Sequence, residues 1–252
     1  MAAVGGPPAR PWAGCWIAGV FVLHSGLAGI SGYGPSAGAS GHLERIPKQR
    51  ANKFEARRGE LAEATLKTLS EMGYARTSLR EIAQNSNFTH GVLHYYFADK
   101  VDLIVCSVRQ YKARCVTRYD RIIATSTSFG ELEERFLDAL AETLSQEAHM
   151  HRLWYDLRSQ ALFDDAFRAD VAEIDDSLKN MIARVTARGR KLARAAQVFS
   201  DADAYAMYDG LFQHYLFRHL AGDTRAVGQM RDGARGLLRL VMGVDAASMV
   251  AA

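Results

Sequence analysis

Proline is confined to one end of this chain. All five prolines lie within the first 47 of its 252 residues, and ten of its 21 glycines lie within the first 41. Proline is the residue least compatible with a helix interior, so the remaining 205 residues can form long uninterrupted helices. No alternating strand pattern competes with this interpretation. The sequence therefore predicts an all-α protein that follows an irregular leader.

The leader, residues 1–46, contains an apolar stretch from Trp12 to Ile30. It has three interpretations: a secretory signal peptide, a membrane span, or a poorly ordered extension that begins at an upstream start codon. A signal peptide would have a stronger basic start than Arg10 alone, and glycines dilute a membrane span. We favour the extension, which we expect to be disordered and to contribute nothing to the fold. We expect no membrane contact.

Residues 77–100 predict two short helices joined by a tight turn. Ser78 and Glu81 have the spacing of a capping box, which marks a helix start. Asn87, within the polar turn, is the best non-glycine candidate for a left-handed turn residue. A second helix begins near Thr89, where Leu93 and Phe97 recur at the spacing of one buried face. Such a pair of helices is one way of placing a helix in a DNA groove.

This segment resembles the tetracycline-repressor (TetR) family of bacterial transcription regulators. The resemblance rests on Thr77-Ser78 with Ile82-Ala83, on the run from Gly91 to Phe97 and on Lys100. This chain has Asn87, Val92 and His94 where the family usually has glycine, a small hydroxyl residue or glycine, and tyrosine. The resemblance implies a repressor that binds a palindromic operator as a homodimer and is released by a small-molecule effector.

The second helix also supplies most of the candidate DNA contacts. We expect Thr89, His90 and Gly91 to meet the groove, with Gly91 permitting close approach. The remaining candidates, for phosphates or neighbouring base edges, are Ser78, His94, Tyr95 and Lys100. A basic cluster from Lys48 to Arg58 precedes these helices and adds to the charge of this region.

The middle of the chain offers a candidate ligand pocket. Its proposed lining is a set of large side chains with one cation: Tyr119, Phe136, Trp154 and Arg158. Aromatic residues at helical spacing form a core more often than a pocket, and Arg158 has an alternative role as the salt-bridge partner of an aspartate. The family resemblance favours the pocket, because members commonly bind an effector in the larger domain.

The last two predicted helices carry apolar residues at alternating three and four spacing, which is typical of a helix pair. The candidate dimer contacts are Tyr205, Tyr208, Phe212, Val227, Met230, Leu237 and Val241. The alternative is that these residues form a core within one chain. A homodimer would place two recognition helices one DNA turn apart.

The pattern predicts nine helices in two domains, a DNA-binding domain over residues 47–99 and a ligand-binding and dimerisation domain over residues 100–245. The expected helices are Phe54–Met72, one from Ser78, one from Thr89, Lys100–Ala124, Glu131–Ala148, His149–Leu162, Asp164–Arg188, Asp201–Leu220 and Thr224–Met242.

Other function classes have little support in the sequence. No catalytic, phosphate-binding or dinucleotide motif is present, so we expect neither an enzyme nor a cofactor. His214 and His219 are five residues apart, which is off the spacing that puts two metal ligands on one helical face, and we expect no metal site. Three cysteines without metal spacing fit reduced thiols in a cytoplasmic protein. Two alternatives remain open: an effector-binding protein with a degenerate DNA-binding head, and an enzyme built on the same bundle.

Overall fold

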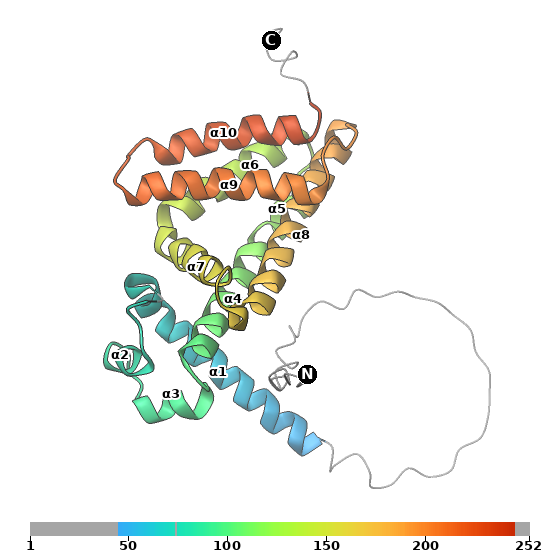
Figure 1. Ribbon diagram of the computed structural model, residues 1–252. Helices are drawn as coiled ribbons and strands as arrows, with labels where there is room; N and C mark the ends of the chain where they lie inside the picture. The colour runs from blue at the N-terminus through green and yellow to red at the C-terminus, as the bar shows by residue number, and fades with distance from the viewer. Residues whose placement is uncertain (1–44, 74, 245–252) are drawn as a thin grey trace, which may run out of the picture. The chain divides into compact units, whose positions relative to one another are not determined.

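The computed structural model describes residues 45–73 and 75–244, and all regular structure within them is helical (Figure 1). The helices are α1 (Arg45–Met72), α2 (Leu79–Gln84), α3 (His90–Tyr96), α4 (Lys100–Arg118), α5 (Asp120–Thr125), α6 (Phe129–Gln146), α7 (Ala148–Gln160), the 3-10 turn η1 (Asp165–Phe167), α8 (Arg168–Ala193), α9 (Asp201–Leu220) and α10 (Ala226–Val241). The predicted all-α class is confirmed for these residues. None of their helices is long and apolar enough to cross a membrane. The stretch from Trp12 to Ile30 lies outside the described residues.

Three helix boundaries differ from the prediction. Helix α1 begins at Arg45 rather than Phe54, with Pro47 in its first turn, where proline is tolerated. The single helix predicted from Lys100 is interrupted at Tyr119, which is both the C-cap of α4 and the N-cap of α5. No glycine or proline marks this break in the sequence. The helix predicted from Asp164 begins with the short turn η1, and α8 follows it.

Short polar side chains start several of the helices, as the sequence predicts for α2 and α3. The hydroxyl of Ser78 accepts the amide N–H of Glu81, and that of Thr89 accepts the amide N–H of Val92. Ser128 and Ser200 cap α6 and α9 in the same way. Such caps satisfy amide groups that have no partner within the helix. Gly73, which follows α1, has a positive φ of 73°, a conformation that glycine commonly adopts directly after a helix.

The boundary between the two compact units of the chain falls inside α1, after Arg57, and every contact described below lies within the unit that begins at Arg58. In that unit α4 packs against α5, α7 and α8, and α10 packs against α6 and α9. Arginines of α10 reinforce its contact with α6: the Arg239 guanidinium donates to both carboxylate oxygens of Glu133, at 2.6 and 2.7 Å.

Candidate DNA-binding helices and ligand cavity

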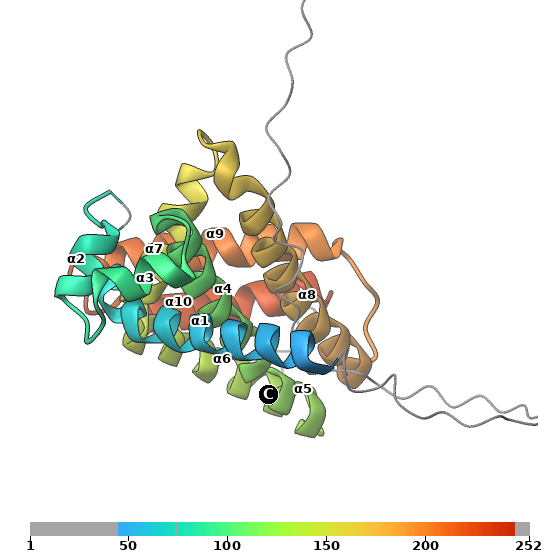
Figure 2. The ribbon, with the colours of Figure 1, turned by 90° about the horizontal axis from the view of Figure 1, so that it is seen from below.

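Helices α2 and α3 lie side by side and are anchored by large apolar residues (Figure 2). Leu79 and Ile82 are the buried residues of α2, and Leu93 is the buried residue of α3. Phe97, the C-cap of α3, is also buried. Because these anchors face the interior, the opposite side of α3 is left open to solvent.

The turn between the two helices keeps negative φ angles. Among the described residues, Arg194 is the one non-glycine residue with a positive φ, so the expectation of a left-handed Asn87 is wrong. Ser86 holds the turn instead: its amide N–H donates to the Ala83 carbonyl, and its hydroxyl accepts the amide N–H of Phe88 at 3.3 Å. A turn closed in this way does not require the conformation that favours glycine.

The exposed side of α3 carries polar and aromatic groups. His90, Gly91, His94 and Tyr95 are all exposed. The Nε2 atoms of His90 and His94 are 3.1 Å apart, so one ring donates to the other. A Cβ atom added at Gly91 would meet nothing within 4 Å, which leaves room for another molecule to approach the backbone. This face can therefore contact a ligand as large as DNA.

A buried ion pair ties the end of this region to α1 and α4. The Arg58 guanidinium lies 2.6 Å from the Asp102 carboxylate, and each side chain is 10% exposed. Asp102 also accepts the amide N–H of Ala98, directly after α3. The guanidinium carbon of Arg58 lies 5.1 Å from the centre of the Phe97 ring. The pair therefore holds the C-terminal end of α3 against α1 and α4.

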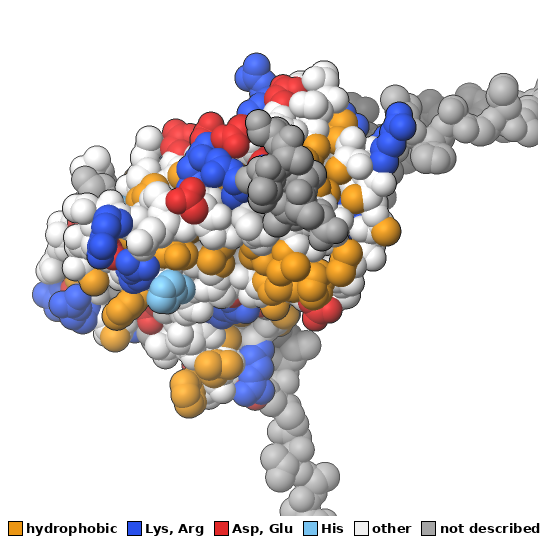
Figure 3. All heavy atoms as spheres, turned by 90° about the horizontal axis from the view of Figure 1, so that it is seen from above, with side chains coloured by type: hydrophobic (Ala, Val, Ile, Leu, Met, Phe, Trp, Pro, Cys, Tyr) orange, Lys and Arg blue, Asp and Glu red, His pale blue; other side chains and the backbone are white. Residues whose placement is uncertain are grey.

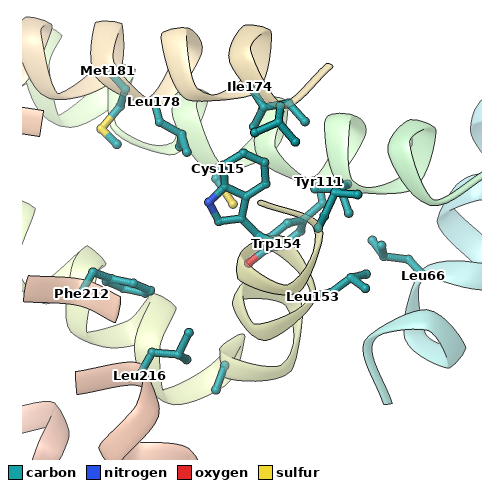
Figure 4. Packing of buried hydrophobic residues seen from close by; sticks show 14 of the residues in the cluster. Leu66, Tyr111, Cys115, Leu153, Trp154, Ile174, Leu178, Met181, Phe212 and Leu216 are labelled. Carbon is teal, nitrogen blue, oxygen red and sulfur yellow. The ribbon is translucent and has the colours of Figure 1, made fainter. Parts of the chain in front are cut away.

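A cavity lies between α4, α6, α7, α8 and α9. Its volume is about 70 Å³. Its lining consists of Lys112, Cys115, Tyr119, Leu140, Thr143, His151, Trp154, Tyr155, Leu178, Met181, Ile182, Tyr205, Tyr208, Asp209 and Phe212. In Figure 4 the Trp154 indole projects from α7 between Cys115 of α4 and residues of α8. The wall is mostly aromatic and aliphatic, as in sites that bind small molecules.

Two polar residues of the wall are almost fully buried and in contact. The ammonium nitrogen of Lys112 is 3.0 Å from Nδ1 of His151. Burial lowers the pKa of Lys112 to about 8, although carboxylates at some distance oppose this shift. Burial, followed by the charges of Lys112 and Arg118, lowers the pKa of His151 well below its usual range. His151 is therefore neutral near pH 7, and Lys112 keeps most of its charge.

Cys115, Glu147 and His151 form a cluster that could be mistaken for a metal site. Their ligand atoms lie within 4.8 Å of one another. Both carboxylate oxygens of Glu147 already accept hydrogen bonds, one from Arg118 and one from Tyr111. Burial raises the pKa of the Cys115 thiol, which opposes the thiolate that a metal needs. With a lysine ammonium beside His151, the cluster fits a metal ion poorly.

Comparison with known proteins supports a DNA-binding role for the segment that contains α2 and α3. Residues 61–105 match the model of the family described as bacterial regulatory proteins, tetR family. The BetI HTH-type transcriptional regulator of Burkholderia cenocepacia (strain HI2424) is 28% identical over 177 residues, covering 68% of this chain and 88% of that protein. Residues 61–105 are therefore a TetR-family DNA-binding segment, and the chain as a whole is similar to transcriptional regulators of that family. It is a DNA-binding transcriptional regulator and not an enzyme, as predicted.

Solved structures show the same fold. A TetR regulator from Haloarcula marismortui has a TM-score of 0.62 at 20% identity, covering 74% of this chain and 99% of that one. FadR of Bacillus subtilis in complex with stearoyl-CoA has a TM-score of 0.57 at 17% identity, covering 73% and 97%. A putative regulator from Saccharomonospora viridis in complex with choline has a TM-score of 0.59 at 17% identity, covering 70% and 92%.

The predicted DNA contacts lie on or beside the exposed face of α3. Thr89, like His90, Gly91, His94 and Tyr95, is exposed, whereas Ser78 and Lys100 are partly buried. The hydroxyls of Ser78 and Thr89 are already engaged as helix caps. Arg80 on α2 is also exposed and is not among the predicted contacts.

The predicted ligand residues separate into two groups. Tyr119 and Trp154 line the cavity. Phe136 is buried behind it and packs on Tyr119 at 5.5 Å between ring centres. Arg158 is not a lining residue; it forms an ion pair with Asp209, which is the salt-bridge role weighed as the alternative. No spacing pattern in the sequence indicates Lys112 and His151, which lie on different helices.

Most of the predicted dimer contacts are buried within the single chain, and this corrects the prediction. Tyr208, Phe212, Met230 and Val241 are each less than 9% exposed and belong to the hydrophobic core. Tyr205 lines the cavity and donates its hydroxyl to Asp175. Val227 and Leu237 are partly exposed. The three and four spacing was real, but it marked the inner faces of α9 and α10.

Proposed function

We propose that this TetR-family regulator is a cytoplasmic homodimer that represses transcription by binding a palindromic operator, and that a small molecule in the cavity releases it. The observation that carries the proposal is the open face of α3, with His90, Gly91 and His94 outward and Leu93 buried beneath them. The cytoplasmic location follows from its DNA target.

On DNA, α3 is the recognition helix. Thr89, His90 and Gly91, at its N-terminal end, meet base edges in the major groove, where imidazole and hydroxyl groups can exchange hydrogen bonds with bases. His94 and Tyr95, one turn further along, meet phosphates or neighbouring base edges. Ser78 and Lys100 contact phosphates, which fix the position of the protein but carry no sequence information.

The dimer forms through the outer face of α9 and α10. Hydrophobic side chains gather across this face in Figure 3. Phe217 is 75% exposed and Leu240 is 56% exposed, which is unusual for such large apolar groups. Gly210 and Gly236 have nothing within 4 Å of an added Cβ, so a second helix can approach closely. Residues 207, 211, 214 and 217 of α9 and 233, 237 and 240 of α10 share the spacing of this face.

Release requires a ligand in the cavity to influence the DNA-binding helices α2 and α3. Helices α4 and α7 contact both the cavity and the region around these helices. Helix α4 carries Asp102, which binds Arg58, and about three turns later Lys112 and Cys115 line the cavity. Helix α7 carries Trp154 at the cavity, and its Arg152 donates to the carbonyl of Ser70 at the end of α1. An effector that binds the DNA-incompetent state more tightly shifts the population towards that state.

A footprint on the intergenic DNA that flanks its own gene tests the first part of the proposal. We expect one protected two-fold symmetric site whose affinity falls as salt rises. Lys100→Ala should weaken all DNA binding and lower the salt slope by about one unit, whereas His90→Ala should change the ranking of operator variants. Equal binding to any DNA sequence, with no protected site, would mean that α2 and α3 no longer recognise a specific operator.

Analytical ultracentrifugation tests the dimer. Phe217→Glu places a charge in the proposed interface and should yield monomers at micromolar concentration, with helix content unchanged. Phe163→Glu is the matched control, because Phe163 is 88% exposed in the connection between α7 and η1, away from this face. If both variants sediment like the wild type, the outer face of α9 and α10 is not the interface.

A further inference from the structure

Three buried groups of the cavity wall offer hydrogen-bond donors without acceptors. An ammonium group can only donate, so the 3.0 Å contact makes Nδ1 of His151 the acceptor and places the ring proton on Nε2. Within the described residues, neither this Nε2 nor the indole Nε1 of Trp154 has a hydrogen-bond partner. Lys112 adds the N–H groups that it does not direct at His151. All these unmet groups are donors.

The nearby carboxylates are already engaged. Asp209 lines the cavity, but it pairs with Arg158 and also accepts the hydroxyl of Tyr155 at 2.9 Å. Glu147 accepts from Arg118 and Tyr111. Among the described residues, no ion pair joins Lys112 to a carboxylate within 4.0 Å. A buried cation without a paired anion is costly, and buried donors without acceptors add to that cost.

The cost persists at neutral pH. Burial lowers the pKa of Lys112 only to about 8, so the ammonium form still exceeds the amine by about ten to one at pH 7. A carboxylate supplies both missing features, a negative charge and several acceptor lone pairs. The aliphatic part of the wall, which includes Leu178 and Met181, suits an apolar body attached to it. In Figure 4 the indole nitrogen of Trp154 lies on the edge of the ring turned towards these residues.

We propose that the cavity binds a small monocarboxylate with an apolar body, whose carboxylate accepts from Lys112, Nε2 of His151 and Nε1 of Trp154. This inference rests on the proposed function of the cavity as the effector site, and it adds the chemical class of the effector.

A cationic ligand is the main competitor, because aromatic walls also attract quaternary ammonium groups. Here the protein supplies its own cation to the largest ring: the Lys112 ammonium is 5.3 Å from the centre of the Trp154 ring. A second cation would be repelled by Lys112, whereas an anion would be attracted. A cation in this cavity would also leave the three donors without acceptors.

Calorimetry with three probes of similar tail length tests the ligand class: octanoate, octan-1-ol and octyltrimethylammonium. We expect octanoate to bind at least tenfold more tightly than either of the others. Lys112→Met should weaken octanoate about 10- to 100-fold and leave octanol within about twofold, because the lost interaction is a hydrogen-bonded ion pair. Lys179→Met is the matched control, since Lys179 lies on the outer side of α8 beside Asp176, and it should change nothing.

Trp154→Phe keeps an aromatic ring but removes the N–H donor, so octanoate should weaken about threefold to tenfold while octanol is unchanged. Unfolding curves of both variants check that each is folded. The proposal is overturned if octanoate does not bind, if the cation or the alcohol binds most tightly, or if Lys112→Met binds octanoate like the wild type. Zinc binding that Lys112→Met strengthens would favour the cluster of Cys115, Glu147 and His151.

Operator release is measured separately by fluorescence anisotropy of labelled DNA. Octanoate that binds through Lys112 without releasing DNA contradicts the proposed regulation but keeps the ligand class. Release by a neutral or cationic compound, equal in wild type and Lys112→Met, contradicts the ligand class but keeps the regulation.

Discussion

Helix α3 and the cavity wall present polar groups to different surroundings. On α3, His90 and His94 are exposed, so solvent can satisfy whatever they do not exchange with each other. Around the cavity, Lys112, His151 and Trp154 are each at least 93% buried, and solvent cannot do the same. The comparison indicates that α3 can vary its contacts at little cost in stability. The buried donors of the cavity lower the stability of the ligand-free protein, and a ligand that accepts their hydrogen bonds can offset this cost.

The largest effect is expected at the buried ion pair between Arg58 and Asp102. Asp102→Ala leaves the Arg58 guanidinium without its carboxylate and the Ala98 N–H without its acceptor. The free energy of unfolding should fall by about 3 to 5 kcal/mol. Asp120→Ala, which breaks the exposed pair with Arg184, should cost less than about 1 kcal/mol. Urea unfolding of both variants measures the difference, and equal costs would remove the distinction between buried and exposed charge.

In the cavity, Lys112→Met should instead raise the free energy of unfolding at neutral pH. The pKa of Lys112 falls from 10.5 to about 8 on folding, so below pH 8 the folded state carries a penalty of about 3 kcal/mol. The unfolded chain holds this proton more tightly, and wild-type stability therefore rises relative to the variant between about pH 8 and 10.5. The titratable groups around Lys112, namely Cys115, His151, Glu147, Asp175 and Asp209, are present in both proteins.

Urea unfolding of ligand-free wild type and Lys112→Met at pH 7, 9 and about 10.5 measures this difference. Lys179→Met should show no such trend. If the difference in free energy of unfolding between wild type and Lys112→Met stays constant with pH, burial does not lower the pKa of Lys112.

His151 predicts a smaller change at acid pH. Its folded-state pKa lies well below 6.5, mainly because it is buried, while the unfolded chain takes up a proton near 6.5. Stability is therefore lost as pH falls below 6.5, by about 1.4 kcal/mol for each unit. His151→Gln should reduce this slope, and His149→Gln, at an exposed site on the same helix, should not. Thermal unfolding between pH 5 and 7 distinguishes the two, and parallel slopes would contradict the buried, neutral imidazole.

The smallest effect is expected on α3. Gly91→Ala should raise the free energy of unfolding by about 0.5 to 1 kcal/mol, because alanine favours a helix and the added Cβ meets nothing. The same methyl group should weaken operator binding if the backbone approaches the DNA closely. Chemical unfolding and anisotropy measure the two effects. Loss of stability would show that even this face is under structural constraint, and unchanged DNA affinity would remove Gly91 from the contact.

The helical frame could be predicted because its signals are local. Ser78 and Thr89 act on amide groups within one turn of themselves, and the structure has both at the predicted helix starts. The break at Tyr119 could not be predicted, because tertiary packing rather than glycine or proline accompanies it: Tyr119 is buried against Phe136.

The polar wall of the cavity was missed for a related reason. Periodicity assigns a lysine to the solvent side of a helix, yet Lys112 faces inward among apolar neighbours. Its contact with His151 joins positions 39 residues apart, and no spacing rule connects them. The apolar stripes of α9 and α10 were read correctly as helical faces, but a stripe does not reveal whether its partner is the same chain or a second copy.

The hydrogen bonds from Arg152 to the end of α1 couple a rotation of α7 to the position of α1. Successive residues of a helix point about 100° apart, so His151 can face the cavity while Arg152 reaches the carbonyls of Ser70 and Glu71, at 2.6 and 3.1 Å. A side chain extends about 5 to 6 Å from the helix axis, and a rotation of about 10° moves its tip by about 1 Å. A ligand that turns α7 by so little would exchange or break these bonds. Arg152 is the residue next to His151, which lines the cavity, and both lie in α7. No flexible segment lies between them to absorb the motion.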